Sequence, residues 1–247
     1  MIGFQIVIEG KWGHFKKPET NNNPLSHDII TKTALIGLIG AVIGIDRVTM
    51  RALFPQLSED LLYGVQLLSP VRKLSWGFTS KTAINPTGSG APKYFEFLKN
   101  PKYLVVLALN NERSQKIFHD FFGYVKEGKA VYTPVLGIHN CPASITWVSE
   151  GEISDRKHGE FSTKGFVLAS KHSLKNVSDG FRIGFDKIPT YQTQDFWNLP
   201  DKYESIIYPD YPHTIDVDGD FYEFKVSKSN SLLSTINVET LDYWCLI

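Results

Sequence analysis

The sequence predicts a mixed α+β fold, in which an N-terminal region of alternating strands and helices is followed by a mostly β region. Aromatic residues make up 13% of the 247 residues, which favours strands over long helices. Two helical patterns occur before about residue 139, and only short strand patterns occur after it. We therefore expect two regions, 1–139 and 140–247.

The first elements are a strand, a long polar loop and a helix. Residues 3–9 (GFQIVIE) form a short β-rich run. Residues 10–30 are polar and irregular, with two prolines and three consecutive asparagines, and so long a loop is usually functional or disordered. Thr31 or Thr33 is suited to cap a helix over residues 33–45, whose glycines indicate close packing against a sheet.

The next elements complete a βαββαβ order. We expect a long strand at 61–74, interrupted near Pro70, and a polar, glycine-rich excursion to about residue 100. A buried strand at 103–109, an amphipathic helix at 113–124 and a strand at 131–136 follow. This order is typical of the ferredoxin-like fold, which many RNA-binding domains of the RRM type use, here with a long β-hairpin at about 71–100.

The C-terminal region shows short strand patterns and no long helix. We expect strands at 144–148, 166–169, 181–185 and 220–226. The sequence DVDGD at 216–220 places its glycine too early for an EF-hand calcium loop, and the alternation around Asp-Gly predicts a tight hairpin instead.

Composition and motifs exclude several classes of function. Lys plus Arg and Asp plus Glu both number 26, so the chain does not coat nucleic acid through bulk charge, although a local basic groove remains compatible. The two cysteines, Cys141 and Cys245, are far apart, and no histidine pair has metal-ligand spacing, so we expect no metal and no cofactor. The glycines of GLIGAVIG lie inside a helical pattern and do not match a dinucleotide fingerprint.

Membrane and targeting signals are also not expected. The N-terminus shows no signal-peptide pattern, and the longest apolar run, 34–45, has 12 residues, which is too short to span a bilayer. We expect a cytoplasmic protein without a membrane partner.

Two segments combine cations with aromatic rings, as single-stranded RNA binding requires. One follows the first strand and contains His14, Phe15, Lys16 and Lys17; the other, in the excursion, contains Arg72, Lys73, Trp76, Lys81 and Lys93. A solvated basic loop is the alternative for each segment.

The opening of the chain resembles the Cas-five family of CRISPR-associated proteins, which belongs to type I Cascade complexes. After the first strand comes the loop GHFKKPET and then ITKTALIGLIGAVIG, which is similar to the family's first helix. FLKNPKYLVVLAL and YTPVLGIHNCPASI resemble later segments of the family. The resemblance covers roughly residues 1–150 and is strongest for the type I-B branch.

The resemblance implies a subunit that binds the 5′ handle of the CRISPR RNA, with the hairpin acting as a thumb. Expected partners are the Cascade backbone subunit, the large subunit and, through the complex, target DNA, in antiviral defence. Thr31, Lys32 and Thr33 would present hydroxyls, an ammonium and free N–H groups to phosphate at the helix start. The full set of expected RNA-binding residues is His14, Phe15, Lys16, Lys17, Thr31, Lys32, Thr33, Arg47, Arg72, Lys73, Trp76, Lys81 and Asn140.

Two other functions remain open at this point. One branch of the family is itself an endoribonuclease, with a Lys-His pair before the thumb. Here Lys157-His158 and Lys171-His172 lie after the thumb, so we expect no catalytic residues, and a metal-independent endoribonuclease that processes CRISPR repeat RNA is the alternative. A ferredoxin-like assembly protein without RNA contact is a third possibility.

Overall fold

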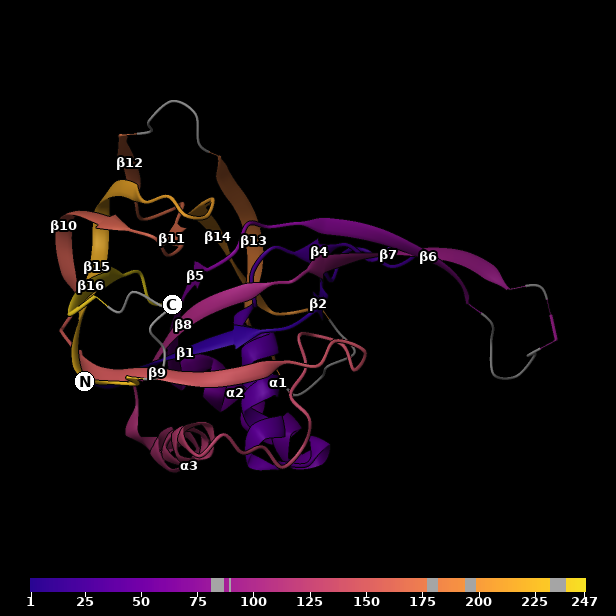
Figure 1. The fold of residues 1–247 in the computed structure, drawn as a ribbon, viewed down its shortest axis with the longest axis horizontal. Helices are drawn as coiled ribbons and strands as arrows, with labels where there is room; N and C mark the ends of the chain where they lie inside the picture. The colour runs from indigo at the N-terminus through magenta and orange to yellow at the C-terminus, as the bar shows by residue number, and fades with distance from the viewer. Residues whose placement is uncertain (81–86, 89, 177–181, 194–198, 232–238) are drawn as a thin grey trace.

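The protein contains a central antiparallel sheet with helices on one face, C-terminal strands that extend this sheet and form a second one, and a long projecting hairpin (Figure 1). The computed structural model describes residues 1–80, 87–88, 90–176, 182–193, 199–231 and 239–247. Over these residues the helices are α1 (Lys32–Ile43), α2 (Arg47–Asp60) and α3 (Gln115–Lys126), with a 3-10 turn at Glu112–Ser114. The longer strands are β1 (Ile2–Glu9), β5 (Leu61–Leu67), β6 (Lys73–Ser80), β7 (Ala91–Lys99), β8 (Lys102–Leu109), β9 (Ser144–Ile153), β10 (Lys157–Thr163), β13 (Ile183–Tyr191), β14 (Lys202–Pro209) and β15 (Ile215–Ser229). The shorter strands are β2 (Trp12–Gly13), β3 (Phe15–Lys16), β4 (Ser26–His27), β11 (Val167–Leu168), β12 (Ser173–Asn176) and β16 (Leu241–Trp244).

The central strands run in the order β9-β1-β8-β5, and each neighbouring pair is antiparallel. This is the order of a ferredoxin-like domain, in which each helical crossover passes over one intervening strand. α1 lies in the first crossover and α3 in the second, and both cover the same face of the sheet (Figure 1). The predicted α+β fold with a β-rich C-terminal region is therefore confirmed.

The fourth strand of this domain differs from the prediction. Residues 131–136 form no strand, and Val135 makes only an isolated bridge to Pro142. β9 takes the place beside β1 instead, with Ser144 opposite Glu9. The strand that completes the first sheet thus begins after residue 140, where we expected a second region to start.

Helix α2 was not predicted. Asp46 caps it, accepting hydrogen bonds from the N–H groups of Val48 and Thr49. Pro55 lies inside the helix, and an internal proline removes one backbone hydrogen bond. The expected strand from residue 61 is shorter than predicted, because β5 ends at Leu67 before the break at Pro70.

The hairpin predicted at 216–220 is wrong. These residues lie within β15, which continues for 15 residues. Asp218, Gly219 and Asp220 pair with Glu160, Gly159 and His158 of β10. Pairing with β10 along its whole length satisfies backbone N–H and C=O groups that a turn at Asp218-Gly219 would leave without partners.

The predicted thumb is confirmed as a hairpin of β6 and β7. The two strands pair from Lys73↔Leu98 to Ser80↔Ala91, and β2 adds to the other side of β7. The thumb therefore contains a three-stranded sheet in the order β2-β7-β6, which extends away from the helices and the central sheet (Figure 1).

Candidate nucleic-acid interface

The sheet face that an RRM domain uses for RNA is closed in this protein. Val7, Leu104 and Val106 point away from the helices and are buried together with Trp244 and Leu246. The chain end also hydrogen-bonds the edge of β5, since the N–H groups of Tyr63 and Ile247 each donate to the other's carbonyl oxygen at 3.1 Å. Bases cannot stack on this covered face, so any RNA site would lie elsewhere.

The start of α1 is capped as predicted but is not open to a phosphate. The Thr31 hydroxyl accepts a hydrogen bond from the Ala34 N–H at 3.2 Å. Thr31 and Lys32 are both buried, with Lys32 only 4% exposed, and β13 packs against α1. Burial lowers the pKa of Lys32 to about 8, with Asp60 opposing the shift. This burial does not favour the expectation that the helix start faces RNA, which stays a prediction; Thr33, one residue on, is half-buried.

His14 and Phe15 are also buried, at 1% and 3% exposure. The His14 ring packs against the rings of Phe95 and Phe97, and its Nδ1 donates to the Glu96 carbonyl oxygen at 2.7 Å. Burial lowers the pKa of His14. Neither ring is exposed for stacking on a nucleotide, and the aromatic loop joins the thumb to the body; an RNA-binding role of His14 and Phe15 stays a prediction.

Two of the predicted cations are already neutralised by carboxylates. Lys17 Nζ lies 2.9 Å from Asp186 Oδ1. Lys73 Nζ lies 2.6 Å from Asp28 and 3.0 Å from Glu96, which together raise its pKa against the effect of burial. These two lysines fix the base of the thumb to the loop and to β13, and are poorly placed to neutralise phosphates.

Lys16 is exposed, and its Nζ lies 3.4 Å from the Asn21 side-chain oxygen. Arg47 is the first residue of α2, and Asn140 lies in the loop before β9, so neither residue is part of the thumb. Both residues are exposed. Lys81 lies outside the described residues.

One face of the thumb keeps the chemistry that RNA binding needs. Side chains alternate between the faces of a strand, so Leu74, Trp76 and Phe78 share one face of β6. Trp76 and Phe78 are each 46% exposed. Trp76 packs on Trp12 and Phe97 at ring distances of 4.5 and 5.4 Å, which holds its ring in place.

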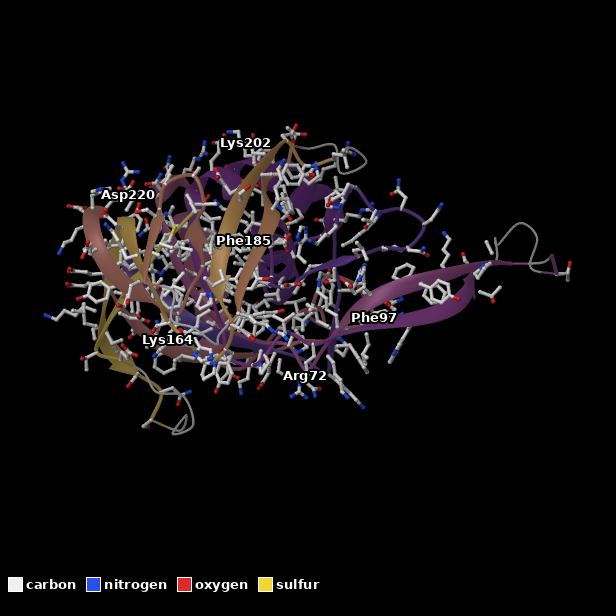
Figure 2. All side chains as sticks on the ribbon, turned by 90° about the horizontal axis from the view of Figure 1, so that it is seen from above. Arg72, Phe97, Lys164, Phe185, Lys202 and Asp220 are labelled. Carbon is white, nitrogen blue, oxygen red and sulfur yellow. The ribbon has the colours of Figure 1, made fainter. Side chains whose placement is uncertain are left out.

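Cations flank these rings on the same face. In the register of β6 and β7, Lys93 lies opposite Phe78, and Arg72 precedes β6 opposite Lys99. Within the described residues, Arg72, Lys93 and Lys99 form no ion pair. Figure 2 shows Arg72 and Phe97 where the hairpin leaves the body. We call this set the thumb face, consisting of Arg72, Leu74, Trp76, Phe78, Lys93, Phe95, Phe97 and Lys99.

Lys99, Phe95 and Phe97 were missed from the sequence. The signal was the alternation in APKYFEFLK, which places two phenylalanines and two lysines on one side of a strand. The sequence predicted a long β-hairpin over this excursion, but these three residues were not among the expected RNA-binding residues.

The two Lys-His pairs meet around Asp220 of β15. His158 is 70% exposed, and its Nδ1 lies 2.9 Å from Asp220 Oδ1, which lowers the pKa of Asp220. His172 is buried, with both ring nitrogens against carbonyl oxygens, those of Leu168 and Asp220. His172 is therefore held as a packing residue, and His158 stands on an open strand surface.

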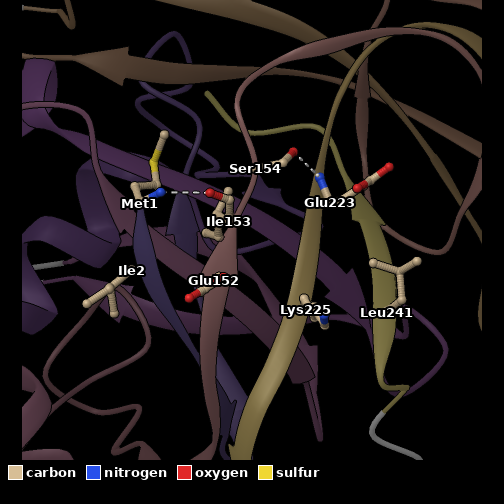
Figure 3. Close-up of a pocket in the computed structure, with 8 residues that line it drawn as sticks. All are labelled: Met1, Ile2, Glu152, Ile153, Ser154, Glu223, Lys225 and Leu241. Carbon is tan, nitrogen blue, oxygen red and sulfur yellow. Dashed lines mark hydrogen bonds between the residues drawn. The ribbon is translucent and has the colours of Figure 1, made fainter.

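A recess beside Met1 and Ile2 holds no comparable chemistry. It has a volume of about 390 Å³ and lies at the end of β1 that is remote from the thumb (Figure 3). Its charged side chains are Glu152, Glu223 and Lys225, and its backbone groups are largely paired: the Met1 amine donates to the Ile153 carbonyl oxygen at 2.7 Å.

Nucleophile and metal chemistry also lack support in the described residues. Burial raises the pKa of Cys141 to about 11 and that of Cys245 to about 12, so both thiols stay protonated near neutral pH. No group of three or more His, Cys, Asp or Glu side chains in the described part of the chain could hold a metal ion. No described helix is long and apolar enough to cross a membrane.

The fold and this surface define an RRM-like protein with a thumb. Residues 5–201 match the family model described as CRISPR-associated protein (Cas_Cas5), so the chain belongs to this family, as its opening segment predicted. Comparison with curated proteins finds no match.

Two solved structures show the same fold. The crystal structure of a CRISPR protein from Archaeoglobus fulgidus is similar over 93% of this chain and 97% of that chain, with a TM-score of 0.56 and 17% identity. A chain of a structure described as a CRISPR RNA-guided surveillance complex is similar over 84% of this chain and 90% of that chain, with a TM-score of 0.52 and 13% identity.

Proposed function

We propose that this protein is a non-catalytic subunit of a type I Cascade complex, of the I-B branch, that binds the 5′ handle of the CRISPR RNA. The observation that carries the proposal is the thumb face, where exposed Trp76 and Phe78 lie between Arg72, Lys99 and Lys93, three cations that form no ion pair with any residue that the structure describes. Family membership supports it, and so does the similar chain from an RNA-guided surveillance complex.

The thumb face can bind single-stranded RNA by two separate contributions. The guanidinium of Arg72 and the ammonium groups of Lys99 and Lys93 neutralise phosphates, which gives salt-dependent affinity. Trp76 and Phe78 offer ring surface to unstacked bases, which contributes about 1–3 kcal/mol per base and depends little on salt.

The proposed partners follow from the branch. The backbone subunit packs beside the thumb, the large subunit contacts the body, and target DNA is reached through the assembled complex. The complex acts in antiviral defence in the cytoplasm.

A binding assay tests this function. Handle RNA is titrated onto the purified protein at several salt concentrations, with Arg72→Ala and Lys99→Ala as variants and Lys116→Ala, 87% exposed on α3, as a charge-matched control. Each thumb variant should weaken binding and lower the slope of log K against log salt by about 0.7, the value for one phosphate of a single strand. Equal affinity and slope in all four proteins would overturn the proposal.

The alternative function, a metal-independent endoribonuclease, has one observation in its favour. The exposed His158 is oriented by Asp220, as a general base often is. Incubation of repeat RNA with the protein in EDTA decides between the two functions. A discrete cut that His158→Ala abolishes would establish the nuclease, and intact RNA supports the binder.

A further inference from the structure

Strand β6 is a free edge of the thumb. The thumb sheet has the order β2-β7-β6, and within the described residues β6 pairs with β7 alone. The edge runs from Lys73 to Ser80, which is longer than the typical strand of 5–6 residues.

The register shows which backbone groups point outward. The Lys99 N–H donates to the Arg72 carbonyl oxygen at 2.8 Å, so position 72 faces β7. Hydrogen-bonded and outward positions alternate along an antiparallel strand. The N–H and C=O groups of Ser75, Gly77 and Thr79 therefore point away from β7.

This edge lacks the usual protection against strand pairing. Natural edges are commonly shortened, charged, bulged or interrupted by proline. β6 contains no proline and pairs with β7 without a register shift. Its one charge in KLSWGFTS is Lys73, whose ammonium is bound by Asp28 and Glu96.

We propose that the outward edge of β6 pairs with an extended polypeptide segment of a neighbouring subunit, by strand addition. Alternating N–H and C=O groups along a strand match a polypeptide backbone, whereas a phosphodiester backbone offers acceptors alone. Apolar side chains of the added strand would pack on Leu74, which is 42% exposed, beside the rings that the proposed function assigns to bases. The proposal rests on the proposed function only in placing the partner in the same assembly.

A second copy of this chain fits the edge less well. Antiparallel self-pairing relates the two strands by an axis perpendicular to the sheet, so both thumb faces would lie on the same side. Arg72, Lys93 and Lys99 of both copies would then share one surface without carboxylates from the described part of either thumb face. Like charges placed together on a sheet are destabilising.

Proline substitution tests the edge without breaking the hairpin. Ser75→Pro and Thr79→Pro each remove an outward N–H that β7 does not use, and edge strands tolerate proline at such positions. Ser75→Ala and Thr79→Ala keep the N–H and serve as controls. The protein is co-expressed with the subunits encoded beside its gene, and its incorporation into the assembly is measured. The proline variants should be incorporated about tenfold less well or worse, the equivalent of about 1.4 kcal/mol, while the alanine variants match the parent.

Amide hydrogen exchange on the unsubstituted protein gives a second, independent readout. The amides of residues 75, 77 and 79 should exchange rapidly in the free protein and with handle RNA alone, and slowly in the assembly. Normal incorporation of both proline variants, or fast exchange in the assembly, overturns the proposal. A homodimer that Ser75→Pro dissolves also overturns it, in favour of self-pairing. If the protein does not bind handle RNA but these amides exchange slowly in the assembly, only the proposed RNA function is overturned.

Discussion

The carboxylate of Asp186 on β13 accepts a hydrogen bond at 3.0 Å from Nδ1 of His27, which lies 159 residues earlier on β4. Both side chains are buried, and Lys17 binds the other carboxylate oxygen at 2.9 Å. The three residues join the loop that precedes α1 to the C-terminal strands. β13 also packs against α1.

Replacement of Asp186 tests how much this junction stabilises the fold. Burial alone would raise the pKa of Asp186, but the hydrogen bonds and charges of His27 and Lys17 outweigh it and hold this pKa well below its usual range. Asp186→Ala leaves both partners without an acceptor and should lower the free energy of unfolding by about 3 kcal/mol at pH 7.

The stabilisation that Asp186 contributes should depend on pH. Because the folded state holds Asp186 ionised more strongly than the unfolded state, its stabilisation is full above the ordinary carboxyl pKa of about 4. It is lost as pH falls below that value. Urea unfolding at pH 7 and pH 3.5 should show a smaller acid-induced loss for Asp186→Ala than for the parent, and equal losses would contradict the assignment.

Local signals in the sequence were sufficient for much of the fold. The Thr31 cap, the glycine-spaced helix and the continuous apolar run at 103–109 are each decided by neighbours in the chain, and each was predicted. Helix α2 was missed because its apolar stripe is weak and Pro55 interrupts it, although Asp46 offered a capping signal. The Asp-Gly turn signal in β15 was overridden by pairing with β10, a contact about 60 residues distant.

The candidate site was predicted less completely, for the same physical reason. Which cations remain free depends on partners far along the chain: Lys17 is neutralised by Asp186 and Lys73 by Asp28 and Glu96. Burial of the aromatic loop likewise depends on the thumb strands that pack over it. A single sequence shows the residue types and their alternation, but not these long-range pairings.

Substitution of Lys32 tests its burial. The ammonium is desolvated near Asp60, whose carboxylate is already bound by Arg113. Lys32→Met should therefore raise the free energy of unfolding by about 1–3 kcal/mol at pH 7, since a buried charge is replaced by an apolar chain of similar length. Affinity for handle RNA should not change.

The difference in the free energy of unfolding between Lys32→Met and the parent should become smaller at high pH. The folded pKa is about 8, whereas a free lysine titrates near 10.4, so the unfolded parent binds more protons in this window. The parent's stability therefore rises between pH 8 and pH 10 relative to the variant. Lys116→Met, at an exposed position, should show no such difference; a constant gap between Lys32→Met and the parent would argue against a buried amine.

Gly137 fixes the segment 132–140 against the base of the thumb. Its φ is +90°, and a Cβ there would lie 1.9 Å from the His14 carbonyl oxygen. Gly137→Ala should lower the free energy of unfolding by about 2–3 kcal/mol, because backbone must move and the conformation is strained. Gly123→Ala, in α3 with open space around it, should instead stabilise by up to about 1 kcal/mol. Thermal unfolding of the two variants measures both, and the same sign for both would refute the packing argument.

Trp76 separates stacking from charge on the thumb face. Its ring is half exposed and packs against Trp12 and Phe97. The position of the ring is therefore fixed, and under the proposed function its exposed part contacts a base. Trp76→Ala should weaken handle RNA binding about 5- to 150-fold, the range that stacking on one base provides. Because no cation is lost, the salt slope should stay at the parent value, whereas Arg72→Ala lowers it. Trp76→Phe should keep most of the affinity, and Phe185→Ala, which removes a 68%-exposed ring from β13, should keep all of it. If Trp76→Ala and Phe185→Ala bind equally well, the rings of the thumb face do not contact RNA, and the cations alone must account for any affinity that remains.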